Sequence, residues 1–194
     1  MLLRAFERLR HRGEVTVVDR CETPLWLNRW YADSMSFPIV TERCDILDMG
    51  SDRTFDLICT HSFFSYFEPA QRPGLLRQWH RLLRPGGAVV TASRIRDSDP
   101  TRPDRFSERQ ADEFVERVRR RASALPALPG ITAAELDDHA RAYARKVEAW
   151  PVRSLQEIRS LFEAARFQID QLASVTISAG VSALPSREKA WVMP

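Results

Sequence analysis

The clearest pattern of apolar and polar positions lies in residues 55–93. A short apolar run at 55–60 is followed by an amphipathic segment and then by a run rich in Val and Thr at 88–93. In the middle segment apolar residues recur at helical spacing: Leu75, Leu76, Trp79, Leu82 and Leu83. Pro85 ends this helix, and the glycines after it allow a tight turn with positive φ. A strand, a helix and a second strand form a βαβ unit, which predicts a parallel sheet.

The residues before this unit repeat the alternation. An amphipathic pattern over 2–12 predicts a helix, and the β-branched run at 14–19 predicts a buried strand that ends in a carboxylate. A helix is then expected from residue 23, and a weaker strand at 38–41. We expect the apolar side chains of the second helix to pack firmly on a sheet: Leu25, Trp26, Leu27, Trp30 and Tyr31.

After residue 93 the pattern changes from strands to long helices. Capping boxes at Ser107–Gln110 and Thr132–Glu135 predict an inserted helical hairpin within residues 104–150, lying over one rim of the sheet as a lid. A third signature at Ser154–Glu157 predicts a closing helix. One long or broken strand is expected over 167–177, and a final antiparallel strand over 189–193.

These elements predict an α/β fold. The order of helices and strands is typical of a Rossmann-like, doubly wound, mostly parallel sheet, here with an antiparallel C-terminal strand and an inserted helical hairpin. A chain of 194 residues is long enough to bury a proper core as one domain, so we expect residues 1–194 to form a single domain.

Charge and composition narrow the expected partners. The net charge is +3, and the densest basic run, 117–121, falls on a predicted helix beside Glu113 and Glu116. This run indicates a solvated helix face, and we expect no nucleic-acid partner. No apolar run approaches the about 18 residues of a membrane span, so no membrane association is expected. The absence of a secretory pattern at the first residues predicts a cytoplasmic location.

The cysteines and histidines show no metal-binding spacing. Cys21, Cys44 and Cys59 are odd in number and each lies in or beside a predicted strand, which favours buried, reduced thiols. The four histidines are scattered along the chain. We therefore predict no metal site.

Polar residues follow three of the predicted strands. Asp19 and Asp45 end the first two, and His61 and Ser62 follow the third. Ligands of an open parallel sheet bind beyond the carboxyl ends of its strands. One carboxylate there could accept the hydroxyls of a ribose, and a second could accept an adenine amino group. An equally weighted alternative is that Asp19 and Asp45 only cap turns.

The order and spacing of four segments resemble class I S-adenosylmethionine-dependent methyltransferases. These segments are 17–19, 44–46, 55–58 and 82–87. The resemblance covers residues 14–93 well and 154–192 more loosely. It implies a Rossmann-like fold, S-adenosylmethionine as cofactor, and methyl transfer to a small-molecule acceptor. The alternative is a non-catalytic methyltransferase-like domain that serves as a binding or scaffold module.

The resemblance also implies roles at the adenosine end of the cofactor. Asp19 would hold the ribose hydroxyls, and Arg20 or Cys21 would lie against the adenine. Asp45 would accept the adenine amino group, while the backbone amide of Ile46 would meet a ring nitrogen.

At the methionine end, the resemblance places Thr60, His61 and Ser62 around the methyl group. Methyl transfer requires the protein to position its two reactants and, where needed, to accept a proton from the nucleophile. His61 is the candidate general base, because it should follow a central strand at the ligand edge. A hydrogen-bonded structural histidine is at least as good an interpretation.

One departure from the family pattern stands out. The family begins with a strand and a glycine-rich loop that cradles the methionine portion, whereas the first glycine of this sequence is Gly13. If this first strand is missing, the strands that end in Asp19 and Thr60 would face each other across a gap one strand wide, about 4.8 Å to either side. Three explanations compete: an N-terminally truncated chain, which we favour, a degenerate relative that binds no cofactor, or a strand supplied by another chain.

Overall fold

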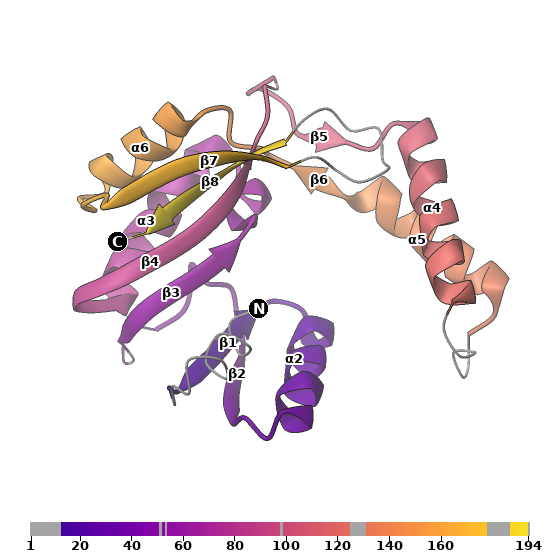
Figure 1. Ribbon diagram of the computed structural model, residues 1–194, viewed down its shortest axis with the longest axis horizontal. Coiled ribbons are helices and arrows are strands. Elements are labelled where there is room, and N and C mark those ends of the chain that lie inside the picture. The colour runs from indigo at the N-terminus through magenta and orange to yellow at the C-terminus, as the bar shows by residue number, and fades with distance from the viewer. Residues whose placement is uncertain are drawn as a thin grey trace.

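The computed structural model describes residues 13–50, 52, 54–97, 99–124, 131–177 and 187–193. Within them the predicted α/β architecture is confirmed: parallel strand pairs alternate with helices, and the last strand is antiparallel (Figure 1). The helix predicted over residues 2–12 lies outside the described residues.

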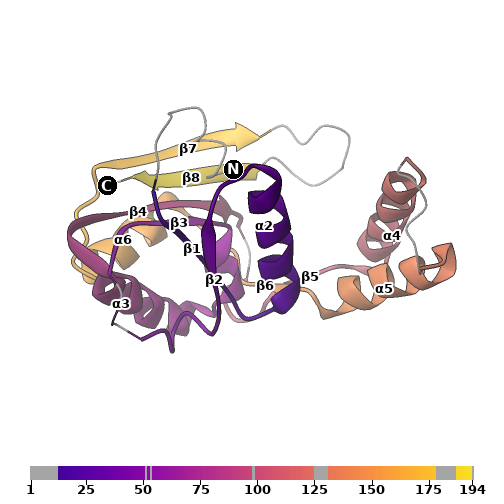
Figure 2. The same ribbon diagram turned by 90° about the horizontal axis from the view of Figure 1, so that it is seen from below.

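The first unit is a strand–helix–strand. β1 (Val15–Asp19) and β2 (Ile39–Arg43) pair in parallel, and α2 (Glu22–Ser34) connects them. Buried Val15 and Ala32 form a small core with partly buried Val17 and Ile39, because α2 packs on one face of the strand pair. Figure 2 shows α2 beside β1 and β2.

The second unit is a four-stranded sheet in the order β3-β4-β8-β7. β3 (Phe55–His61) and β4 (Leu83–Ile95) are parallel, while β8 (Arg187–Met193) runs antiparallel to both β4 and β7 (Gln171–Ile177). The antiparallel C-terminal strand is therefore present. The strand expected to begin at residue 167 begins only at Gln171, because the preceding residues form the turn that closes the last helix.

Two helices cover one face of this sheet and hold the main core. After the 3-10 turns η1 (Phe63–Tyr66) and η2 (Pro69–Gln71), α3 (Arg72–Leu82) packs beside α6 (Leu155–Ala164) (Figures 1 and 2). Leu75, Leu76, Trp79 and Leu82 of the predicted stripe are buried on α3. The prediction that Pro85 ends the helix is wrong, because Leu83 already pairs with Phe55 as the first residue of β4. The core consists of Phe64, Phe67, Leu75, Leu76, Trp79, Val89, Ile95, Val152, Ile158 and Phe162.

The inserted segment forms an arm. β5 (Asp104–Arg105) pairs with β6 (Glu148–Ala149), and between them α4 (Glu108–Ser123) packs against α5 (Ala133–Lys146). Both capping boxes are formed as predicted. The expected position over the rim of the sheet is wrong, since α4 and α5 extend away from the sheet and pack mainly on each other (Figure 1).

The packing predicted for α2 is only partly correct. Leu25 is buried, but Trp26, Leu27 and Trp30 are 55%, 48% and 61% exposed. Among the residues that the structure describes, only β1 and β2 form the sheet beneath α2, which is too narrow to cover both the inward face of the helix and these side chains.

The prediction of buried thiols is wrong. Cys21 and Cys59 are exposed and Cys44 is intermediate, although all three are free thiols. Cys59 is exposed because it lies on β3, which pairs with a neighbouring strand on one edge only among the described residues. Partial burial still raises the pKa of the Cys59 thiol.

Gly87 lies in β4, near the point where its register with β3 shifts, and it approaches other backbone atoms closely. A Cβ at Gly87 would lie 2.9 Å from the carbonyl oxygen of Arg84 and 3.0 Å from that of Phe55. We expect Gly87→Ala to lower the free energy of unfolding by about 1–3 kcal/mol, because backbone atoms must move to admit the methyl group. Urea denaturation followed by circular dichroism measures this change.

Gly50→Ala is the matched control, because a Cβ at Gly50 meets nothing within 4 Å. Its free energy of unfolding should stay within about 0.5 kcal/mol of the wild type. Equal stability of Gly87→Ala and the wild type would show that the backbone around Gly87 moves without cost to admit the methyl group.

Candidate functional site

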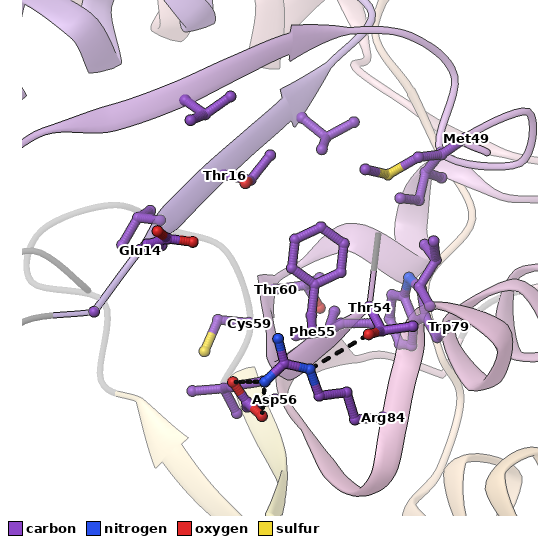
Figure 3. A pocket seen from close by; sticks show the side chains of 18 of the residues that line it. Glu14, Thr16, Met49, Thr54, Phe55, Asp56, Cys59, Thr60, Trp79 and Arg84 are labelled. Atoms are coloured by element: carbon purple, nitrogen blue, oxygen red, sulfur yellow. Dashed lines mark hydrogen bonds and ion pairs between the residues drawn. The ribbon is translucent and has the colours of Figure 1, made fainter. Parts of the chain in front are cut away.

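A cavity of about 1160 Å³ separates the two sheets. Residues of β1 line one side and residues of β3 line the other. In Figure 3, Glu14 and Thr16 lie across from Cys59 and Thr60, and the ring of Phe55 points into the space between them. Within the part of the chain that the structure describes, β1 pairs only with β2 and β3 only with β4. The cavity therefore lies between two strand edges that carry no ladder partner there.

The predicted site residues fall into two groups. Asp19, Ile46, Thr60 and His61 line the cavity, at the carboxyl ends of β1 and β3 and in the loop after β2. The remaining three, Arg20, Asp45 and Ser62, are not among the lining residues. The structure thus brings four of the seven to one space.

Asp19 and Asp45 both make the turn-capping contacts that the alternative interpretation predicts. Oδ1 of Asp19 accepts a hydrogen bond from the backbone N–H of Cys21 at 2.7 Å, and Oδ1 of Asp45 accepts from Leu47 N–H at 3.0 Å. Each bond occupies one carboxylate oxygen. Since a carboxylate has two oxygens and about four acceptor positions, capping leaves both groups able to accept ligand hydroxyl or amino groups.

Arg20 links the two strand ends. Its guanidinium lies 3.5 Å from Oδ2 of Asp45, with 80% of the Arg20 side chain exposed. The Arg43 guanidinium also donates to the backbone carbonyl of Arg20 at 3.3 Å. An exposed pair of this kind contributes about 0–1 kcal/mol, so a ligand that offers Asp45 an amino group can displace Arg20 at low cost.

The end of β3 presents different chemistry. The hydroxyls of Thr60 and Thr91 are 2.7 Å apart and share a hydrogen bond, which ties Thr60 to β4. His61 is exposed at the cavity. Ser62 has positive φ, and its buried Oγ has no hydrogen-bond partner. This edge of the cavity therefore combines a fixed hydroxyl with an accessible imidazole.

Sequence reasoning missed much of the cavity lining. Met49, Trp79 and Leu82 reach it from the loop after β2 and from α3. Asp56 of β3 and Arg84 of β4 also line it and pair at 3.0 Å (Figure 3). From the sequence alone, these residues are expected in the core or on the surface, not at a ligand site. The gap between β1 and β3 was expected from the sequence, but no local pattern encodes which side chains of other elements face it.

Among the residues that the structure describes, no His, Cys, Asp and Glu side chains cluster in a group that could hold a metal ion. In the same part of the chain, every helix is too short or too polar to cross a bilayer.

A family model described as a methyltransferase domain matches residues 1–87. No curated protein sequence matches the chain. The matched segment includes β1, β2 and β3 and ends at Gly87, so it carries all of the predicted site residues.

Solved structures with the same fold cover nearly the whole chain. A S-adenosylmethionine-dependent methyltransferase from Methanosarcina mazei has 13% identity and a TM-score of 0.60, over 93% of this chain and 80% of that one. A putative methyltransferase from Bacillus halodurans has 11% identity and a TM-score of 0.60, over 99% of this chain and 85% of that one.

A third structure contains bound molecules. It is the Burkholderia thailandensis 1,6-didemethyltoxoflavin-N1-methyltransferase, with 1,6-didemethyltoxoflavin and S-adenosylhomocysteine bound. It has 17% identity and a TM-score of 0.59, over 98% of this chain and 64% of that one. The chain spans between 39% and 53% of several other matching structures, so it is shorter than many chains of this fold.

Three observations agree: the order of the parallel strands, the carboxylates at the ends of β1 and β2, and the matches to a family model and to solved structures. They confirm the predicted resemblance to class I S-adenosylmethionine-dependent methyltransferases, a class whose cofactor is S-adenosylmethionine. Residues 1–87 match a methyltransferase domain, and the chain shares the fold of S-adenosylmethionine-dependent methyltransferases.

Proposed function

We propose that this chain binds S-adenosylmethionine at the carboxyl ends of β1, β2 and β3 and transfers its methyl group to a small-molecule acceptor. The observation that carries the proposal is the placement of Asp19, Ile46, Thr60 and His61 around one cavity. Its volume of about 1160 Å³ exceeds the about 300–1,000 Å³ of usual ligand pockets, so a nucleoside-sized ligand fits within part of it.

Asp19 and Asp45 are the proposed contacts at the adenosine end. β1 and β2 are adjacent and parallel, with Asp19 opposite Arg43 in the register, so Asp45 follows two residues beyond that pair. The two carboxylates therefore stand at neighbouring strand ends. Asp19 would accept from the ribose hydroxyls and Asp45 from the adenine amino group, with Arg20 against the ring and the Ile46 amide at a ring nitrogen.

His61 is the proposed general base. S-adenosylmethionine supplies a methyl group on a sulfonium, which is already a good leaving group, so the protein mainly has to orient the acceptor. An imidazole nitrogen of His61 can take the proton that the acceptor loses, because the side chain is exposed at the cavity beside Thr60 and Ser62.

The proposed acceptor is a small molecule, not a nucleic acid. The Burkholderia relative acts on 1,6-didemethyltoxoflavin, as its name states. Two arginines of the basic run on α4 have acidic partners: Arg119 pairs with Glu116 at 3.0 Å and with Asp137 at 2.5 Å, and Arg120 lies 3.9 Å from Glu116. These pairs neutralise part of the surface that a phosphate backbone would need.

Calorimetric titration of the full chain with S-adenosylhomocysteine tests the proposal. We expect saturable binding, and we expect Asp19→Asn to weaken it by about 10- to 100-fold, because hydrogen bonds to a charged group contribute about 1.5–3 kcal/mol. Asparagine keeps an oxygen that can accept from Cys21 N–H, so the turn is preserved while the charge is lost.

Asp33→Asn on α2 is the matched control, because Asp33 is exposed and does not line the cavity. It should bind as the wild type does. Equal binding by Asp19→Asn and the wild type would reduce Asp19 to a turn cap, contrary to the proposal.

The second candidate function is a non-catalytic binding or scaffold domain. The internal bonds of Asp19 and Asp45, together with the Arg20–Asp45 pair, favour it, because the carboxylates of the site already have partners within the chain. A wild-type chain that is folded but does not bind S-adenosylhomocysteine would support this second function.

A further inference from the structure

The chain leaves β3 through a strained residue. Ser62 has φ 55° and ψ 25°, which is the left-handed region. A side chain with a Cβ adopts this conformation at a cost in free energy, so the surrounding contacts must hold it there. Ser62 directly follows His61, the proposed general base. Whatever holds Ser62 therefore also sets the direction in which β3 ends.

Hydrogen bonds on both sides of Ser62 hold this conformation. Its N–H donates to the carbonyl oxygen of Ala92 on β4 at 2.6 Å. Its own carbonyl oxygen accepts from Oγ of Ser65 at 2.7 Å. The first bond ties the residue to the sheet and the second closes the chain onto η1. Since η1 carries Phe64, which is 1% exposed in the core, this turn has a fixed support.

Ser65 also connects the turn to the root of the arm. Its carbonyl oxygen accepts from the backbone N–H of Trp150 at 2.8 Å, just after β6. The Trp150 carbonyl in turn accepts from the buried guanidinium of Arg72 at 2.5 Å. Ser65 is thus the residue at which the end of β3, the turn η1 and the segment after β6 meet.

We infer that Ser65 is a positioning residue, which holds the β3 end of the proposed cofactor site through its hydroxyl. The inference rests on the proposed function. Loss of the hydroxyl frees the Ser62 carbonyl and lets the strained turn relax, which moves Thr60 and His61. Asp19 and Asp45 lie on other elements. The effect should therefore fall on the methionine end of the ligand and spare the adenosine end.

Ser65→Ala separates these two ends when two ligands are titrated into the full chain. S-adenosylhomocysteine carries the amino-acid portion, whereas 5′-methylthioadenosine has the same adenosine without it. We expect the variant to bind S-adenosylhomocysteine about fivefold more weakly, which corresponds to one hydrogen bond of about 1 kcal/mol, and to bind 5′-methylthioadenosine unchanged. Ser65→Thr keeps the hydroxyl and should restore the affinity.

Amide hydrogen exchange supplies a readout that does not require ligand. Exchange in residues 60–64 should be several-fold faster in Ser65→Ala than in the wild type, while Ser160→Ala, at an exposed position of α6, should leave it unchanged. If the wild type binds neither ligand, the proposed function fails, whereas faster exchange in Ser65→Ala still supports the anchoring of β3.

Two results would overturn the inference. One is a Ser65→Ala chain with wild-type exchange in residues 60–64, since the hydroxyl would then hold nothing. The other is an equal loss of affinity for both ligands, because a general loosening of the fold, unlike a displaced β3 end, weakens both alike.

Discussion

Replacement of Arg72 by alanine is expected to lower the free energy of unfolding by about 3–5 kcal/mol, the usual cost of breaking a buried ion pair by removing one partner. Arg72 is 1% exposed. Its guanidinium pairs with Glu157 on α6 and donates to the carbonyl oxygens of Trp150 and Pro151, at 2.5 Å and 3.4 Å for the two carbonyls. Without it, Oε1 of the partly buried Glu157 carboxylate and two backbone carbonyls lose their donor. Urea denaturation measures the change.

The charge of Arg72 persists despite its burial. Burial lowers the pKa of the Arg72 guanidinium, and the neighbouring Glu157 carboxylate opposes that effect. Arg72→Lys should therefore retain the pair with Glu157 while it loses the forked contact to the carbonyls, and its stability should fall between those of the wild type and Arg72→Ala.

Arg153→Ala is the matched control, since Arg153 pairs with the same Glu157 at 3.3 Å but has a side chain that is 46% exposed. Its loss should cost about 0.2–1 kcal/mol. If both alanine variants lost the same free energy, burial would not be the reason for the importance of Arg72.

Trp79→Ala is the second large expected effect. Trp79 is 0% exposed, and its ring centroid lies 5.4 Å from that of Phe64 and 6.5 Å from that of Phe162. Truncation of a buried tryptophan leaves a large void between α3, η1 and α6, which should cost about 3–5 kcal/mol. The free energy of unfolding from guanidinium titration checks this value, and Trp79→Phe should recover part of it.

Trp30→Ala provides the comparison, because Trp30 lies on α2 and is 61% exposed. Its free energy of unfolding should stay within about 0.5 kcal/mol of the wild type. A loss as large as that of Trp79→Ala would mean that α2 is covered in solution and that the exposure of its tryptophans is not the state of the folded protein.

Local patterns in the sequence predicted the element types well. The βαβ unit from β3 to β4 and the capping boxes of α4 and α5 were predicted from residues only a few positions apart. Such patterns depend on side-chain periodicity and on hydrogen bonds between residues i and i+3, so they can be recognised without knowledge of the fold. The packing of α2 was predicted less well, because the apolar positions of a helix carry no information about the width of the sheet beneath it.

The candidate site was predicted in part. The strand-end rule located Asp19, Thr60 and His61, which line the cavity. The rule places polar groups at an edge but does not say which of them share a space. Arg20 and Asp45 bond to each other outside the lining, and the thiol of Cys59, expected to be buried, is exposed.

The sequence by itself determined the class of fold, the parallel order of the strands and the carboxylates at the ends of β1 and β2, because each depends on neighbours along the chain. The tertiary structure alone decided three further features. It determined which side chains line the cavity between β1 and β3, joined Arg72 to Glu157 across 85 positions, and made Ser65 the junction of β3 and the arm. These features depend on which distant segments pack together. Contacts between residues so far apart in the sequence leave no periodic pattern in it.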